Sequence, residues 1–329
     1  MHNELRNTSA LVMGGSRGLG LLLAARLTLR GNRVTIAARD KDELREGAAW
    51  IAAHAGAEPS IRVCDVRDDT AVRTTVDDVA AQQDGLDAVF ANAGIIQVAP
   101  LDALTPDDFR DAMDTMFHGC VRTALAALPH LRRSPAGGRL VLTGSVGGLL
   151  GVPHLVPYSC AKSAIGTLAE GLSAELAGSG VSVTAAHPGL MRTGSHLKAE
   201  FGGPAEREYA WFSALSGTPL VSMDAERAAE RIVRAAERRR PRVVLTPAAH
   251  AASLAHGLAP ALTTRLTGVA ARLLPSADAP TDTVPGETLP TPRPRSRVLA
   301  GLHQAGRYLN DKAATRLNQL HRTEKGNTA

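Results

Sequence analysis

The chain has 329 residues, 44% of them hydrophobic and 21% charged, which is the composition of a globular protein with a substantial core. Its net charge of +5 suits an anionic small molecule or a membrane surface, but there is no RNA-binding aromatic pattern and no metal-ligand spacing, which argues against nucleic acid and a bound metal. The 3 cysteines are few, and we see neither a signal peptide nor an uninterrupted apolar run of about 18 residues, so we expect a cytoplasmic protein.

Short apolar runs alternate with helical patterns from the N-terminus onward. Strands are expected at 10–15, 33–38, 60–66 and 86–94, with helices at 19–31, from 40 to about 54, and ending near 83. Asp40 is expected to cap the second helix, with Glu43 completing a capping box.

The alternation continues through the middle of the chain. A long helix over 109–132 precedes a fifth strand at 138–145, a helix carrying Tyr158 precedes a sixth at 181–189, and 241–247 is a candidate seventh. Strands rich in Val, Leu and Ala that alternate with helices predict a doubly wound α/β fold, in which helices cover both faces of a mostly parallel sheet of about seven strands.

The pattern changes near Pro247. Apolar residues recur every three or four positions from Leu254 to Leu273, and Pro260 should divide this stripe into two helices. The stripe could pack against the domain or a second subunit, lie on a membrane surface with Arg265 and Arg272 at its polar margin, or span a membrane. We expect a catalytic domain at 1–247, an amphipathic helical extension at 248–275, a flexible linker at 276–295 and a tail, helical in part, at 296–329.

The stretch "GGSRGLG", Gly14 to Gly20, joins the first predicted strand to the first predicted helix. Glycines allow a tight turn and close approach to a pyrophosphate, and the helix N-terminus offers free N–H groups. At this junction the motif predicts a dinucleotide-binding loop.

The end of the second strand bears on which dinucleotide binds there. NAD usually requires an acidic side chain for the ribose hydroxyl, but Ala37 and Ala38 fill that place. Arg17 and Arg39 could both face a 2′-phosphate, for which a guanidinium is well suited. We therefore expect NADP(H) in preference to NAD(H), and the rival interpretation makes Asp40 a ribose ligand.

Three polar residues suggest the reaction chemistry. Ser145 ends the fifth strand, and Tyr158 and Lys162 lie four residues apart, on one face of the predicted helix. A nearby ammonium favours the phenolate, so we expect Lys162 to lower the pKa of Tyr158 and make its proton available to a carbonyl held by Ser145.

Together these motifs resemble the short-chain dehydrogenase/reductase family in its single-domain Rossmann form. The matching stretches, which cover roughly 8–245, are "GGSRGLG", "CDV" at Cys64–Val66, "NAG" at Asn92–Gly94, Ser145, "YSCAK" and "PGLMRT" at Pro188–Thr193. The resemblance implies that Asp65 contacts adenine, that Asn92 supports the cofactor, and that Pro188, Gly189 and Thr193 hold the nicotinamide end. The implied cofactor-binding set is Gly14, Ser16, Arg17, Gly18, Leu19, Gly20, Arg39, Asp65, Val66, Asn92, Ala93, Gly94, Tyr158, Lys162, Pro188, Gly189 and Thr193; the implied catalytic set is Ser145, Tyr158 and Lys162.

The chain departs from the family pattern at two positions. Met13 replaces the threonine that often precedes the loop, and Met116 occupies the place of an asparagine thought to support a water-mediated proton relay to the lysine. A thioether cannot replace an amide there, so the relay would pass through His118 or solvent, or turnover would be slow.

The region after Thr193 corresponds to the substrate lid of the family. Tyr209, Trp211 and Phe212 would form a wall for a hydrophobic carbonyl compound, or they would pack the lid onto the core, and His154 could border the pocket. We expect an NADP(H)-dependent oxidoreductase that acts on carbonyls or secondary alcohols and forms homo-oligomers. The alternatives are a non-catalytic NADP(H) sensor, motivated by Met116, and a membrane-associated scaffold.

Overall fold

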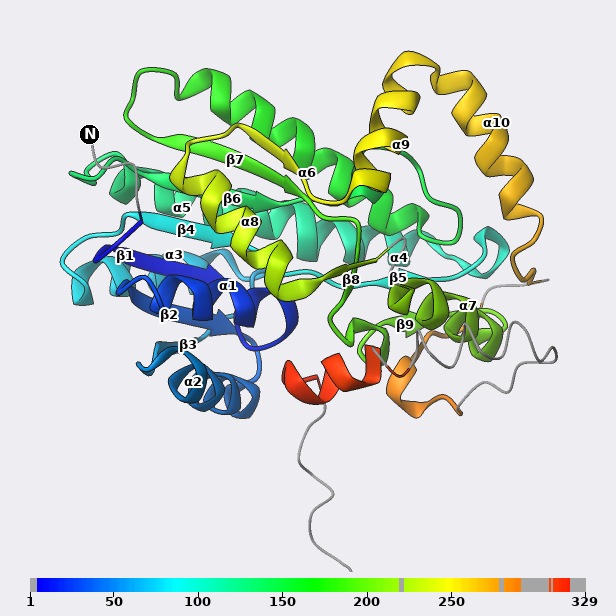
Figure 1. Cartoon of the computed structure of the whole chain (residues 1–329), viewed down its shortest axis with the longest axis horizontal. Helices are drawn as coiled ribbons and strands as arrows, with labels where there is room; N and C mark the ends of the chain where they lie inside the picture. Colours follow the sequence, from blue (N-terminus) through cyan, green and yellow to red (C-terminus); the bar gives the residue numbers. More distant parts are fainter. Residues whose placement is uncertain (1–4, 219–221, 278–280, 291–307, 309, 320–329) are drawn as a thin grey trace, which may run out of the picture.

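The computed structural model describes residues 5–218, 222–277, 281–290, 308 and 310–319. Its centre is a parallel sheet of seven strands in the order β3-β2-β1-β4-β6-β7-β11 (Figure 1). The strands are β1 (Ser9–Met13), β2 (Arg33–Ala38), β3 (Ser60–Val63), β4 (Ala88–Ala91), β6 (Arg139–Thr143), β7 (Ser182–His187) and β11 (Arg242–Val244). The central β1, β4 and β6 are buried along their whole length, which is why their sequences are nearly continuous apolar runs.

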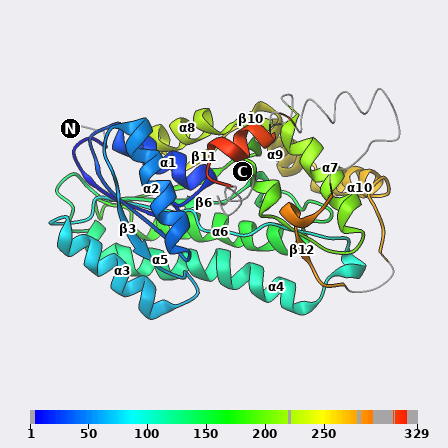
Figure 2. The ribbon, with the colours of Figure 1, turned by 90° about the horizontal axis from the view of Figure 1, so that it is seen from below.

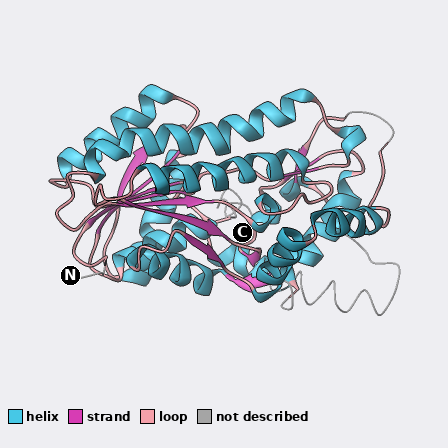
Figure 3. Cartoon of the chain, turned by 90° about the horizontal axis from the view of Figure 1, so that it is seen from above, coloured by secondary structure: helices cyan, strands magenta, loops and turns pink. Residues whose placement is uncertain are grey.

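Helices cover both faces of the sheet, as the views from below and from above show (Figures 2 and 3). Ala10 and Val12 of β1 face one layer while Leu11 and Met13 face the other, because successive side chains of a strand point to opposite faces. The first layer contains α1 (Gly18–Thr28), α2 (Lys41–Ala55) and α8 (Ala225–Glu237), and the second contains α3 (Asp69–Gln82), α5 (Gly119–Leu131) and α6 (Val156–Glu175). The predicted doubly wound α/β fold is confirmed.

The long helix expected over 109–132 is interrupted. It consists of α4 (Pro106–Ala112), a π-helical turn (Met113–His118) and α5, and it begins with a capping box between Thr105 and Asp108. Single π-helical turns are frequent at functional sites. This one carries Met116.

Smaller elements lie beyond the carboxyl ends of the central strands (Figure 1). One small sheet pairs β8 (Leu190–Arg192) with β10 (Ser222–Asp224), and another has the order β12-β9-β5, formed by Val284–Pro285, Glu200–Phe201 and Gln97–Val98. Helix α7 (Ala205–Gly217) packs against both. Strand β12 lies within the stretch expected to be a linker, of which 278–280 and 291–295 are outside the described residues.

Two helices follow β11, and Pro260 separates them as predicted. They are α9 (Pro247–Leu258) and α10 (Pro260–Ala271), and α10 has no buried residue. Within the described ranges, none of the helices has both the length and the hydropathy needed to cross a bilayer. Farther on, 310–316 are helical, while 296–307, 309 and 320–329 of the predicted tail lie outside the described residues.

Candidate active site

The fold brings Ser145, Tyr158 and Lys162 together at the carboxyl end of β6. Ser145 follows that strand, and its Oγ accepts a hydrogen bond of 3.1 Å from the Gly147 N–H. Lys162 is only 4% exposed; its Nζ donates to the Thr143 carbonyl at 2.7 Å and lies 5.7 Å from the ring centroid of Tyr158. Helix α6 thus directs the phenol and the amine toward the end of β6, as the sequence predicted.

The acid–base properties of the pair differ from expectation. Burial raises the pKa of Tyr158, against the opposing effect of a hydrogen bond with Ser145. Burial also lowers the pKa of Lys162 from 10.5 to about 8. The net direction is opposite to the expected lowering of the phenol pKa, because burial outweighs the opposing hydrogen bond with Ser145.

His187 is a site residue that the sequence analysis missed. It ends β7, is 1% exposed, and its Nδ1–H donates to the Ser145 carbonyl at 3.2 Å. Burial lowers its pKa to about 4, so the ring is neutral at pH 7 and holds the Ser145 loop through one fixed tautomer. The signal in the sequence was a lone histidine before "PG", which gives no hint of a partner 42 residues away.

The glycine-rich loop is shaped by close backbone contacts. Gly14 has a φ of +74°, and a Cβ there would lie 2.7 Å from Ala93. A Cβ at Gly20 would lie 1.9 Å from the Gly14 carbonyl oxygen, to which Asn92 Nδ2 donates at 3.2 Å. Side chains are therefore excluded from the turn, and a tight glycine turn that leads into the N-terminus of α1 is the kind of loop that fits the pyrophosphate of a dinucleotide.

A buried carboxylate supports this loop from α2. Glu43, 5% exposed, accepts a hydrogen bond of 2.8 Å from Ser16 Oγ and forms an ion pair with Arg17. Asp40 caps α2 by accepting from the N–H groups of Asp42 and Glu43, so the predicted N-cap is confirmed. This arrangement holds the Arg17 guanidinium beside the loop.

Other predicted cofactor residues follow the carboxyl ends of strands β2, β3 and β7. Arg39 is exposed just after β2, and its charge is among the influences on Asp65. Burial opposes ionisation of Asp65, but hydrogen bonds from Arg67 hold its pKa below the usual value. On the other side of the site, the Pro188 carbonyl accepts from Val146 N–H at 2.8 Å, and Thr193 Oγ1 accepts from Ser195 N–H at 3.3 Å.

Met116 lies near the lysine, as the alignment of motifs suggested. A Cβ at Gly94 would be 3.5 Å from Met116 Sδ and 3.7 Å from Lys162 Nζ, so the thioether and the amine both border Gly94. Met116 is 1% exposed, whereas His118 is exposed and its Nδ1 lies 3.5 Å from Asp114 Oδ1. His118 is therefore a surface residue in this structure.

Comparisons with known proteins agree with this geometry. Residues 8–200 match the sequence model of the short chain dehydrogenase family, which is more than half of the chain. The chain belongs to this family. It is 29% identical over 278 residues to fatty acyl-CoA reductase of Acinetobacter baylyi (84% of this chain, 88% of that protein). It is 33% identical over 207 residues to human 17-beta-hydroxysteroid dehydrogenase type 1 (61% and 62%).

A solved structure of the family superposes well. The short-chain dehydrogenase of Mycobacterium paratuberculosis bound to NAD is 26% identical, covers 74% of this chain and 97% of its own, and gives a TM-score of 0.64. The protein is thus an NAD(P)-dependent short-chain dehydrogenase/reductase. The enzymatic names of its relatives favour an oxidoreductase over a sensor or scaffold.

The region after Thr193, where the lid is predicted, packs through aromatic rings that form a hydrophobic cluster with Val98 and Leu155. Phe201 meets Tyr209 and Phe212 edge to face, with centroids 5.4 and 5.9 Å apart, and Tyr209 and Phe212 are each 4% exposed. Trp211 is only partly buried, and its Nε1 donates to Glu208 at 2.7 Å. Glu208 also receives a bond of 2.9 Å from His154 Nδ1, which links the lid to the loop before Tyr158.

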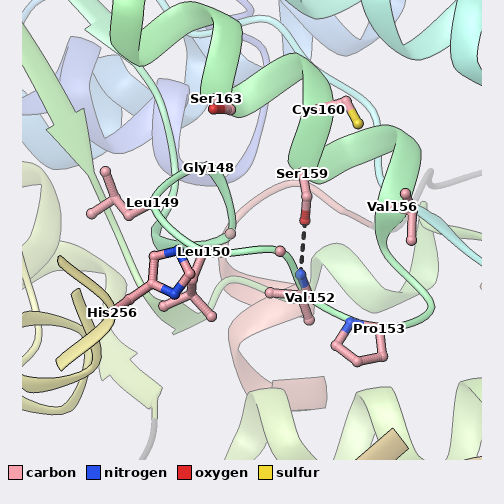
Figure 4. A pocket seen from close by; sticks show the side chains of 12 residues that line it. Gly148, Leu149, Leu150, Val152, Pro153, Val156, Ser159, Cys160, Ser163 and His256 are labelled. Carbon is pink, nitrogen blue, oxygen red and sulfur yellow. Dashed lines mark hydrogen bonds between the residues drawn. The ribbon is translucent and has the colours of Figure 1, made fainter. Parts of the chain in front are cut away.

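A cavity of about 450 Å³ lies beside α6, on the outer side of the loop that follows Ser145 (Figure 4). Its lining comes from 147–153, from Val156, Ser159, Cys160 and Ser163 of α6, and from His256 of α9. Ser145, Tyr158 and Lys162 are not among the lining residues. A Cβ at Gly147 would nevertheless lie 3.5 Å from Tyr158 Cε1, so one loop separates the cavity from the phenol.

Proposed function

We propose that this protein transfers a hydride between NADP(H) and the carbonyl or secondary alcohol carbon of a hydrophobic substrate. The observation that carries the proposal is the meeting of Ser145, Tyr158 and Lys162 at the end of β6, beside a glycine loop shaped for a dinucleotide. The proposed cofactor-binding residues are those that the family resemblance implied. When bound, the nicotinamide supplies the hydride in reduction and accepts it in oxidation.

The chain's own residues manage the proton. In reduction, the Tyr158 hydroxyl donates its proton to the carbonyl oxygen while the hydride, with its two electrons, reaches the carbon. Ser145 Oγ–H donates a hydrogen bond to the same oxygen and stabilises the charge that develops there. The Lys162 ammonium, 5.7 Å from the phenol ring centroid, stabilises the phenolate that remains, and solvent returns the proton. Oxidation reverses each step.

Tyr158→Phe tests this assignment because it removes one oxygen and keeps the ring. We expect loss of turnover with NADPH affinity within about twofold of the wild type. NADPH fluorescence would report binding, and a panel of aliphatic, steroid and aromatic carbonyl compounds followed at the NADPH absorbance would report turnover. Turnover near the wild-type rate in Tyr158→Phe would refute the proposal.

The preference for NADP(H) rests on the charges around the adenosine end of the loop. Arg17 and Arg39 are cationic, Ala37 and Ala38 offer no acid, and Asp40 is engaged as the cap of α2. Arg39→Ala should therefore lower kcat/KM for NADPH by about tenfold or more and leave that for NADH nearly unchanged. An equal loss with both dinucleotides would contradict the preference.

The hydrophobic substrate class rests on the lid and on the relatives. Trp211 is the part of the aromatic cluster left partly exposed, and two relatives are named for fatty acyl-CoA and 17-beta-hydroxysteroid. We expect Trp211→Ala to raise KM for the best apolar substrate several-fold with little change for a small polar carbonyl. A uniform change across the substrate panel would indicate a packing role only.

We also propose that the chain is cytoplasmic and consists of a catalytic domain at 1–247 followed by a helical extension at 248–275. This extension, which contains α9 and α10, would be the surface through which the chain self-associates. Six apolar side chains stand exposed there, namely Leu254, Leu258, Leu262, Leu266, Val269 and Leu273. A second copy would cover this face. Leu258→Lys with Leu266→Lys should then reduce the assembly mass in sedimentation equilibrium. A monomeric wild type that co-sediments with anionic liposomes would instead support peripheral membrane contact.

A further inference from the structure

The C-terminal segment, defined here as residues 310–319, crosses the edge of the sheet where the dinucleotide is proposed to bind. It follows the family-matched residues 8–200 by more than a hundred positions, yet Asn310, Ala314 and Leu317 are at most 1% exposed. Figures 1 and 2 show this short red helix outside the carboxyl ends of the central strands. Such burial requires specific partners in the catalytic domain.

One end of the segment is bonded to the glycine-rich loop. The Gly18 N–H donates to the Leu317 carbonyl at 3.0 Å. Asn318 Nδ2 donates to the carbonyls of Ser16 and Glu43, each at 3.1 Å. Gln319 packs so closely that a Cβ on Gly18 would lie 2.8 Å from its Nε2.

The other end is bonded to the loop that follows β8, on the far side of the proposed site. The Gly194 N–H donates to Asn310 Oδ1 at 3.0 Å, and Asn310 Nδ2 donates to Ser216 Oγ at 3.0 Å. Ala314 lies against Gly194, where a Cβ would come within 2.3 Å of the Ala314 Cα. His196 Nε2 is 3.1 Å from Asp311 Oδ1.

The first anchoring loop, Gly14–Gly20, is the one assigned to the pyrophosphate, and Gly194 of the second anchoring loop directly follows Pro188–Thr193, the stretch assigned to the nicotinamide. A segment held to both must cross between them. In addition, Gln319 Oε1 is buried without a hydrogen-bond partner among the described residues, a state that costs free energy and that a donor such as a ribose hydroxyl would relieve.

We propose that residues 310–319 are a strap that forms the outer wall of the dinucleotide site and must move aside when the dinucleotide enters or leaves. This inference rests on the proposed function, because the strap retains the cofactor assigned there. If the strap must open before the dinucleotide can leave, the dissociation rate of the dinucleotide is reduced by the fraction of time for which the strap is closed.

The test weakens both anchors in the full-length protein without straining the backbone. Asn318 has a φ of +56°, so Asn318→Gly removes the amide and keeps the left-handed conformation. It is combined with Asn310→Ala. Thr315→Ala is the matched control, because Thr315 lies on the exposed face of the same helix.

We expect NADPH to dissociate about tenfold faster from the double variant, since each lost hydrogen bond changes the opening equilibrium several-fold. Stopped-flow displacement of NADPH measures this rate, and Thr315→Ala should match the wild type. Hydrogen exchange of 310–319 should also slow when NADPH binds to the wild type.

The outcomes separate the strap from the proposed function. NADPH binding with an unchanged dissociation rate in the double variant, or with no added protection of 310–319, would overturn the strap alone. Tighter binding by the double variant at an unchanged dissociation rate would overturn it as well, by showing a segment that obstructs the site. A wild type that binds neither NADPH nor NADH would overturn the proposed function and the strap together.

Discussion

Replacing Lys162 with methionine should stabilise the folded protein while abolishing its turnover. The amine is buried, and among the described residues no carboxylate lies within ion-pair distance of it. The nearby Cys120 thiol is neutral at pH 7, because burial raises its pKa to about 11. Within the described part of the chain, the hydrogen bond to the Thr143 carbonyl is the one polar contact that offsets the cost of burying the ammonium.

The size of the effect follows from the pKa. Folding lowers the pKa of Lys162 from 10.5 to about 8. At about 1.4 kcal/mol per pKa unit, the charged amine costs on the order of 3 kcal/mol at pH 7. Methionine fills a similar volume without a charge, but it leaves the Thr143 carbonyl without its donor, which costs about 1 kcal/mol. The net gain should be about 2 kcal/mol, or roughly 4 °C in Tm.

The pH dependence distinguishes this cause from better packing. Below pH 8 the amine is charged in both the folded and the unfolded chain, and the penalty is complete. Between pH 8 and 10.5 only the unfolded wild type still binds the proton, so the wild type gains stability as pH rises and the difference from Lys162→Met should close. Thermal unfolding of the ligand-free proteins at pH 7, 8.5 and 10 measures it. A variant less stable than the wild type at pH 7, or a difference independent of pH, would refute the reasoning.

Three further changes test other parts of the site. Below pH 6.5 the unfolded chain protonates His187, whereas the folded chain does so only near pH 4, so the wild type should lose about 3 kcal/mol across that window. Urea unfolding of His187→Asn should lack this slope. Gly20→Ala should weaken NADPH binding at least tenfold because its Cβ would lie 1.9 Å from the Gly14 oxygen, while the control Gly171→Ala, in open space on α6, should bind normally. Met116→Asn should raise kcat several-fold, because the family has an asparagine at this place in the proton relay. The buried amide should also lower the free energy of unfolding in urea by about 1–3 kcal/mol. An unchanged kcat would show that no relay passes through this position.

The sequence alone predicted the framework of the fold and the placement of Tyr158 and Lys162 on one face of a helix. Both depend on short-range patterns. Strand and helix periods are local, and the spacing of Tyr158 and Lys162 places them on one helix face whatever packs around it. The glycines from Gly14 to Gly20 likewise express a local requirement, since the turn leaves no space for a Cβ.

The tertiary structure decided everything that depends on burial or on segments distant in sequence. It reversed the expected direction of the Tyr158 pKa, because desolvation depends on the complete packing of α6 against the sheet. It placed His187 under the Ser145 loop and brought Asn318 to Ser16, 302 positions away. Neither contact produces a pattern in the sequence, because each depends on a single side chain whose partner is brought near only by the tertiary fold.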